Sequence, residues 1–220
     1  MAQKGRGIFL LYADIDTEHE DDFRSWYDSE HLPELRAVPG ILSAARYEAH
    51  DEDNGSGPKF LACYELENAA VLQSAAFKNR PRTEWGARVS PTVIGKNLIR
   101  ISGEQIFPAE VEMSERGMAP VLQIGRMSVP EEADEEWNRW YNGEYIPGYR
   151  KVPGVVYARR YRVHEGTVGY TTVYEFENAD VSQSAKWQEQ QRTSSRNTPR
   201  MRKTMTHATG SPGIYVRIDY

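Results

Sequence analysis

FRSWYDSEHLPELRAVPGILSAARYEAH, residues 23–50, returns further along the chain as WNRWYNGEYIPGYRKVPGVVYARRYRVH, residues 137–164, with 12 of 28 aligned positions identical. A second stretch, YELENAAVLQSAAFKN at 64–79, matches YEFENADVSQSAKWQE at 174–189 in the same order, with 9 identities in 16 positions. Each copied unit covers about half of the 220 residues. The chain is therefore a tandem duplication of a domain-sized unit rather than an array of short repeats.

Both copies pass through the same series of predicted elements. An apolar strand leads into an acidic stretch that suits the first turn of a helix, and that helix carries an aromatic stripe and should stop or kink at a proline. A hairpin, a helix capped by asparagine and a last strand follow. The strands are expected at 7–14, 41–50, 59–67 and 94–107 in copy one, and at 121–129, 155–164, 169–177 and 213–219 in copy two. The helices capped by asparagine are expected at 69–80 and 179–192, and the prolines of the first helices are Pro33 and Pro147.

The order β-α-β-β-α-β, met twice, defines the expected fold class. It predicts an α+β protein made of two tandem ferredoxin-like repeats, packed sheet to sheet as an intramolecular α+β barrel. We expect an N-terminal repeat over 1–108, carrying the active site, and a diverged C-terminal repeat over 119–220 that acts as a scaffold or binds ligand. The linker should lie near 108–119, where strand periodicity is lost.

Composition narrows the classes of partner. The net charge of −5 argues against nucleic acid, and no stretch approaches the length of a membrane span, so a small-molecule substrate is the expected partner, with a homo-oligomer left open. The lone Cys63 excludes an internal disulfide and makes the cytoplasm the default location. The basic run at 192–203 reads as a solvated helix end, with an anion clamp as the alternative.

Residues that differ between the copies point to a site. Asp28 and His31 of copy one become Asn142 and Tyr145 in copy two, while the tryptophan, tyrosine, glutamate and proline around them are kept. A carboxylate on one imidazole nitrogen would fix the tautomer and leave the other nitrogen free to move a proton. Loss of both groups together therefore indicates that they act as a pair in one copy only.

The pattern F-x-x-W-Y-x-x-E-H-x-P followed by V-P-G-I-x-x-x-x-R-Y resembles the dimeric α+β barrel superfamily, in particular EthD-like proteins. The resemblance covers nearly all of both repeats and is strongest over 23–47. It implies that the histidine of its H-x-P motif, His31 here, lines the ligand cavity. The superfamily holds oxygenases, isomerases, cyclases, lyases and haem enzymes, so the fold does not select the reaction.

The predicted catalytic residues are His31 as general base or acid, Asp28 as its orienting partner and Tyr27 as a hydrogen-bond donor. Substrate contacts are expected from Tyr47, Tyr64, Arg46, Trp26, Tyr141 and Tyr145, since tyrosines on a concave sheet can orient an aromatic ligand. Glu30 and Glu144 are expected to pair with Arg46 and Arg160. No metal-ligand spacing, phosphate loop or nucleophile elbow occurs, so neither a metal site nor another cofactor is predicted.

The favoured function is a cofactor-independent acid/base enzyme of the lyase, isomerase or cyclase type, acting on a small aromatic or cyclic molecule. Two alternatives stay open. One is a cofactor-free or haem-dependent oxygenase on the same fold. The other is a non-catalytic protein that binds a small molecule.

Overall fold

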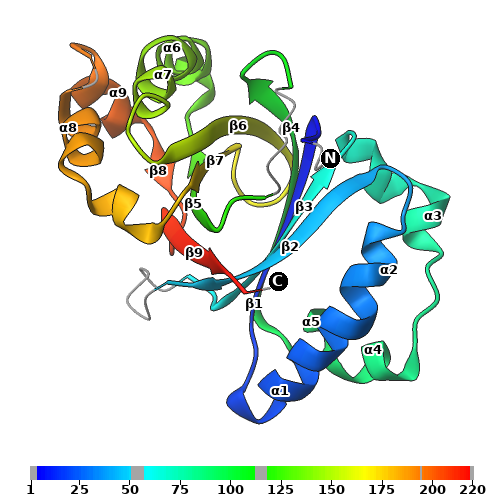
Figure 1. Cartoon of the computed structure of the whole chain (residues 1–220). Coiled ribbons are helices and arrows are strands. Elements are labelled where there is room, and N and C mark those ends of the chain that lie inside the picture. The colour runs from blue at the N-terminus through cyan, green and yellow to red at the C-terminus, as the bar shows by residue number, and fades with distance from the viewer. Residues whose placement is uncertain (1–3, 51–56, 112–117, 194, 219–220) are drawn as a thin grey trace.

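Eight antiparallel strands close into a barrel in the computed structural model, which describes residues 4–50, 57–111, 118–193 and 195–218 (Figure 1). The strands follow each other as β7-β6-β4-β1-β3-β2-β9-β5, and pairing of β5 with β7 closes the ring. A two-residue strand, β8, adds to the outer side of β5. The bounds are β1 (Gly7–Asp14), β2 (Ile41–Ala49), β3 (Phe60–Leu66), β4 (Lys96–Phe107), β5 (Val121–Ser128), β6 (Val155–Glu165), β7 (Tyr170–Phe176), β8 (Thr206–His207) and β9 (Gly213–Arg217).

Each half of the chain supplies four neighbouring strands of the barrel. The order is β4-β1-β3-β2 in the first half and β9-β5-β7-β6 in the second, so matched strands occupy matched places. The halves join along two antiparallel seams, β4 with β6 and β2 with β9. The predicted mixed α and β architecture with a shared barrel is therefore confirmed. The proposed linker near 108–119 lies largely outside the described residues.

Alternation along the strands separates two environments, because successive side chains point to opposite faces. In β3, Leu61 and Cys63 face the barrel interior, whereas Ala62 and Tyr64 pack under the helices of the first half. Strand β7 repeats this arrangement, with Val173 inside and Tyr174 under the helices of the second half. The protein thus has one core inside the barrel and one on each outer flank.

The helices of each half cover that half's outer flank (Figure 1). The first helix of each half is continuous through a π-helical turn. The helical bounds in the first half are α1 (Thr17–Trp26), η1 (Tyr27–His31), α2 (Leu32–Arg36), η2 (Ala69–Gln73), α3 (Ala75–Lys78), α4 (Glu84–Val89) and α5 (Pro91–Ile94). In the second half they are η3 (Glu131–Ala133), α6 (Asp134–Trp140), η4 (Tyr141–Tyr145), α7 (Ile146–Tyr149), η5 (Ala179–Gln183), α8 (Ala185–Thr193) and α9 (Thr198–Thr204).

Two details of the predicted helices need correction. Pro33 and Pro147 do not stop the first helix: each is the second residue of the α-helical segment that follows the π turn, and the helix continues through it. The second helices are not single. Asn68 and Asn178 do cap them, accepting from the backbone at 3.0 and 3.1 Å, but each begins as a 3₁₀ turn and restarts at a serine.

Four charged side chains form a ring inside the barrel, each no more than 5% exposed. Lys4 Nζ lies 2.6 Å from Glu175 Oε1 and 3.6 Å from Glu65 Oε1. Arg159 donates to Glu65 Oε2 at 2.9 Å and to Glu175 Oε1 at 3.1 Å. The ring ties strands of both halves together. Among the described residues, no helix is both long enough and apolar enough to cross a bilayer.

Candidate functional site

The π-helical turn decides where His31 points. The N–H of Leu32 bonds to the carbonyl of Tyr27, five residues back, instead of the four of an α-helix. This register brings His31 over Trp26, and the two rings stack with centroids 4.5 Å apart at 21°. The second half repeats the turn, and Tyr145 packs on Trp140 at 4.6 Å. Single π turns of this kind are found frequently at functional sites.

His31 opens onto a cavity of about 290 Å³ between the first helix and the segment that joins α3 to α4. The walls that matter chemically are Trp26, Glu30, His31, Glu34, Arg80 and Thr83. The imidazole makes ring contacts with Trp26 and Tyr27 and no hydrogen bond to a described residue. Its ring nitrogens are therefore available to a ligand.

Burial, more than charge, keeps His31 neutral. Burial, reinforced by the positive charge of Arg80, lowers the pKa of His31 to about 4. The pKa of Glu34 is changed in the opposite direction, because burial and the neighbouring Glu30 raise it. At neutral pH the cavity thus holds an imidazole able to accept a proton, next to a cation.

Arg80 is a half-buried cation that has no carboxylate within ion-pair distance in the described part of the chain. Its guanidinium packs over the ring of Phe77, 4.0 Å from the centroid, and donates to the Phe77 carbonyl. Burial lowers its pKa. A guanidinium in this position can hold an anion that enters the cavity.

Glu30 closes one side of the cavity. Its Oε1 accepts from Trp26 Nε1 at 2.7 Å and from Thr83 Oγ1 at 2.5 Å, which joins the first helix to the start of α4. The predicted pairing of Glu30 with Arg46 is therefore wrong. Arg46 pairs instead with Asp28, at 2.7 Å.

Asp28 does not reach His31. Its side chain is 53% exposed and accepts from Arg46, and no hydrogen bond between Asp28 and His31 forms among the described residues. In a turn closed by bonds to the fifth residue, positions three apart no longer share a face. The same pattern in the second half corrects the expected pairing of Glu144 with Arg160, since Arg160 donates to Asn142.

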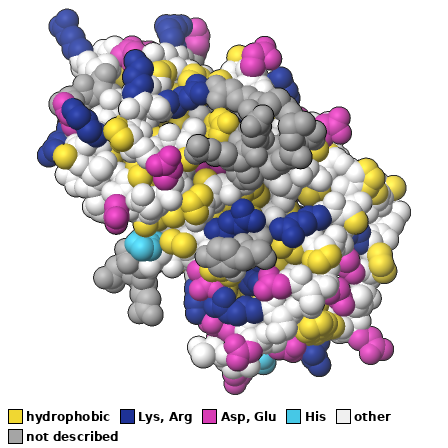
Figure 2. All heavy atoms as spheres, viewed as in Figure 1, with side chains coloured by type: hydrophobic (Ala, Val, Ile, Leu, Met, Phe, Trp, Pro, Cys, Tyr) yellow, Lys and Arg dark blue, Asp and Glu magenta, His cyan; other side chains and the backbone are white. Residues whose placement is uncertain are grey.

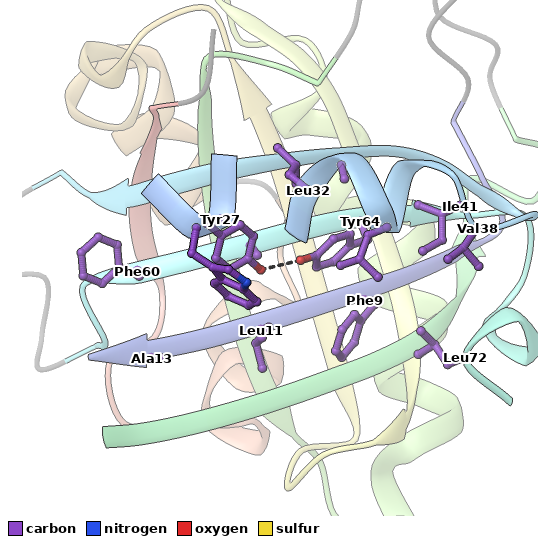
Figure 3. Close-up of a cluster of buried hydrophobic side chains, with 14 of the residues drawn as sticks. Phe9, Leu11, Ala13, Tyr27, Leu32, Val38, Ile41, Phe60, Tyr64 and Leu72 are labelled. Carbon is purple, nitrogen blue, oxygen red and sulfur yellow. Dashed lines mark hydrogen bonds between the residues drawn. The ribbon is translucent and has the colours of Figure 1, made fainter. Parts of the chain in front are cut away.

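The predicted tyrosine lining is split by the sheet. Tyr27 and Tyr64 lie under the first helix with their hydroxyl oxygens 2.5 Å apart, and neither lines the cavity of His31 (Figure 3). Burial raises the pKa of Tyr27 to about 12. Tyr47 points into the barrel and donates to the carbonyl of Ala119 at 2.9 Å.

The second half has a hollow at the matched position, but it is lined by Glu144, Gly148 and Gln190 and has neither the histidine nor the arginine of the first half. The Tyr145 hydroxyl lies 3.1 Å from that of Tyr149, and the Tyr141 hydroxyl lies 3.5 Å from that of Tyr174. Neither Tyr141 nor Tyr145 lines this hollow, an open depression of about 490 Å³ beside Gly143. Of the nine predicted site residues, the structure brings only His31 and Trp26 to the cavity.

Arg80 and Thr83 are the residues that sequence reasoning missed. The sequence did contain a signal for Arg80, because the second copy has Gln190 at the matching position. This is the same kind of difference between copies that drew attention to His31.

The described residues hold no cluster of three or more histidine, cysteine or acidic side chains able to bind a metal ion. Haem is a poor fit at His31. The walls carry several charges, and a volume of about 290 Å³ falls at the low end for pockets of drug-sized ligands.

No protein-family model matches the chain, and no curated protein matches it. Solved structures do. An anthrone oxidase-like protein aligns with a TM-score of 0.59 at 12% identity, over 96% of this chain and 90% of that one. A protein from Lactobacillus acidophilus NCFM named "putative monooxygenase" aligns at 0.57 and 12%, over 96% and 94%. A mutant chlorite dismutase from Candidatus Nitrospira defluvii aligns at 0.59 and 11%, over 99% and 93%.

The chain shares the fold of these solved structures along almost its whole length. At identities this low the likeness concerns the fold alone. A shared fold does not select a reaction.

Proposed function

We propose that this protein is an enzyme in which neutral His31 removes a proton from a small, weakly acidic organic molecule, and Arg80 holds the anion so formed. The observation that carries the proposal is the pairing of an imidazole whose pKa is lowered to about 4 with a half-buried guanidinium on the same cavity. The base is ready at neutral pH, and the cation stabilises charge that develops on the substrate.

The remaining cavity residues have supporting roles in this proposal. Trp26 fixes the imidazole plane by stacking, and Glu30 holds the cavity wall through Trp26 and Thr83. Glu34, with its raised pKa, is a group that can take the proton onward from His31 to solvent. Asp28 and Tyr27 position the helix and do not touch substrate.

Two fates of the substrate anion lead to different reaction classes. Return of the proton to another atom, or loss of a leaving group, gives the isomerase or lyase chemistry expected from the sequence. Reaction with O₂ gives a cofactor-free oxygenase, in which a CH₂ group and O₂ become C=O and H₂O, with one oxygen atom in each product. We test the second fate first, because proteins of the same fold are named as anthrone oxidase-like and as a putative monooxygenase.

The test uses the difference between the two copies. His31→Tyr installs the residue of the second half, and Arg80→Gln installs the counterpart of Gln190. With anthrone and related cyclic ketones as probes, we expect His31→Tyr to slow exchange of the acidic C–H, followed by NMR in D₂O, by about 10²–10⁴-fold. Oxygen uptake measured in parallel separates the two fates. Wild-type exchange rates in His31→Tyr would end the proposal.

The organisation of the chain belongs to the same proposal. We interpret residues 1–108 and 119–220 as two ferredoxin-like units that form the barrel within one chain, supported by the matched strand order of the two halves. The EthD-like assignment rests on the Trp-Tyr and His-x-Pro motif of the first unit.

A further inference from the structure

A further cavity, open to solvent like the depression beside Gly143, lies in the C-terminal half, on the flank of the barrel away from His31. It measures about 370 Å³ and is bounded by α8, β5 and β9. Its polar walls are Gln123, Ser182, Gln183, Gln188, Gln191 and Arg192, and Trp187 contributes the aromatic surface. Figure 2 shows Lys and Arg side chains prominent over the lobe that carries α8 and α9.

Two largely buried side chains, Gln123 and Trp187, present polar groups to this cavity. Gln123 is 9% exposed and Trp187 is 5% exposed, and both line the cavity. Neither the Gln123 amide nor the Trp187 indole N–H forms a hydrogen bond to a described residue. Neither group is among the fully enclosed polar atoms of the described residues, so both reach the cavity space and are free to bond a ligand there.

Comparison of the halves shows that this polarity is specific to the second. Gln123 opposes Tyr174 in the barrel register as Phe9 opposes Tyr64. Phe9 is 4% exposed and stacks on Tyr64, at 5.5 Å between ring centroids. The second half thus places an amide where the first half has an aromatic core residue.

A neighbouring position is also apolar in the first half and polar in the second. Ser182 stands where the first copy has Leu72, and both are buried. The Ser182 hydroxyl donates to the carbonyl of Ala179 at 2.9 Å, which leaves its oxygen able to accept. Two apolar residues have therefore become hydrogen-bonding ones around a single cavity.

The charge of the walls defines the ligand further. Arg192 is exposed at the rim and forms no ion pair within the described residues, and no aspartate or glutamate lines the cavity. Amides and hydroxyls pair well with ligand hydroxyl groups, and a guanidinium pairs with a carboxylate through two parallel hydrogen bonds.

From this arrangement we infer that the C-terminal half binds a small hydroxylated carboxylic acid, with the hydroxyl groups on Gln123 and the neighbouring amides and the carboxylate on Arg192. This site is separate from the His31 cavity and does not depend on the reaction proposed there.

The experiment is isothermal titration calorimetry of the full chain with D-gluconate, with D-glucose as the uncharged control. We expect gluconate to bind more tightly than glucose. Arg192→Gln should weaken gluconate binding about tenfold, the loss of one charge-assisted hydrogen bond, without affecting glucose. Gln123→Phe, which copies Phe9, should abolish binding of both.

Three results would overturn the inference: no gluconate binding, equal affinity for gluconate and glucose, or unchanged affinity in Gln123→Phe. His31→Tyr serves as the location control and should leave gluconate affinity unchanged. If Gln123→Phe lowers the thermal midpoint, Gln188→Ala on the exposed rim replaces it and should weaken binding of both probes.

Discussion

At the scale of single residues, the imidazole of His31 is kept from charging by its surroundings. Most of the ring is buried against Trp26 and Tyr27, and the positive charge of Arg80 adds to the effect of burial. A histidine in this setting accepts a proton only when a substrate brings it. Its acid strength is therefore a property that kinetics and unfolding can both measure.

The rate profile should show this acid strength directly. Because His31 acts when it is neutral and its pKa lies at about 4, kcat/KM should fall only as the pH drops through about 4 and should be level from about 5 to neutral. In Arg80→Gln the acid limb should move toward higher pH without reaching the ordinary value of 6.5, since burial is the larger cause. An acid limb near 6.5 in the wild type contradicts the neutral-base assignment.

Stability should depend on pH through the same group. The folded pKa lies below the unfolded value of 6.5, so the unfolded state binds the proton more tightly, and stability falls as the pH decreases from 6.5 to about 4. The wild type should lose up to about 3 kcal/mol more than His31→Tyr over this range. Urea unfolding at pH 7 and pH 4.5 measures the difference, and parallel curves for the two proteins would contradict the shift.

Asp28 offers a residue-scale test of a structural role. Asp28→Asn should reduce the free energy of unfolding by about 1 kcal/mol or less, because Asn142 already accepts a hydrogen bond from Arg160 at the matched place. Asp28→Ala should cost about 1–3 kcal/mol, since it removes an acceptor of the buried Arg46. Denaturant unfolding checks both. Equal losses in the two variants would show that charge, rather than the hydrogen bond, is what matters.

At the scale of elements, the π turns explain what the sequence could and could not predict. Strand alternation, the hairpins and the asparagine caps were readable because each depends on neighbouring residues. The orientation of His31 could not be predicted in this way, because a one-residue change of helical register places Asp28 beside Arg46 and His31 on Trp26. The prediction that the tyrosines line one ligand cavity is wrong for a related reason, because Tyr47 and Tyr64 lie on opposite faces of the sheet.

The second π turn contains a glycine that makes an element-scale prediction. A Cβ at Gly143 would meet nothing within 4 Å, so Gly143→Ala should stabilise the protein by about 0.5–1 kcal/mol by restricting the unfolded chain. Gly154→Ala is the matched control. There φ is +85° and the Cβ would lie 2.5 Å from Val181, so stability should fall. Thermal midpoints decide, and a lower midpoint for Gly143→Ala would contradict the prediction.

At the scale of the whole molecule, the ring of Lys4, Glu65, Arg159 and Glu175 joins the two halves inside the barrel. Burial opposes ionisation of Glu65, but Arg159 and Lys4 outweigh it and lower the pKa of Glu65 below its ordinary 4.5. The ring could not be predicted from the sequence, because a charged residue in an apolar strand is normally expected on the solvent-exposed face. The matched Glu65 and Glu175, each between apolar neighbours, were the available signal.

Breaking the ring should weaken the whole barrel. Glu65→Gln leaves buried cations without a full counter-charge and should lower the free energy of unfolding by about 3–5 kcal/mol. Glu48→Gln, which removes a partner of Arg24 near the surface, should cost about 1 kcal/mol or less. Since the folded pKa of Glu65 is depressed, its contribution is complete above about pH 4.5 and is lost as the pH falls further. Equal costs for the two variants would contradict this role.

The two seams that unite the halves in a single polypeptide, β4 with β6 and β2 with β9, also have a genetic consequence. A barrel assembled from two products of one gene inherits every mutation twice, once in each flank. Here a mutation reaches one flank only, and the other keeps its ancestral chemistry. The pocket of one half can therefore stay unchanged while mutations in the other half alter which ligands its pocket binds, and the first activity is kept.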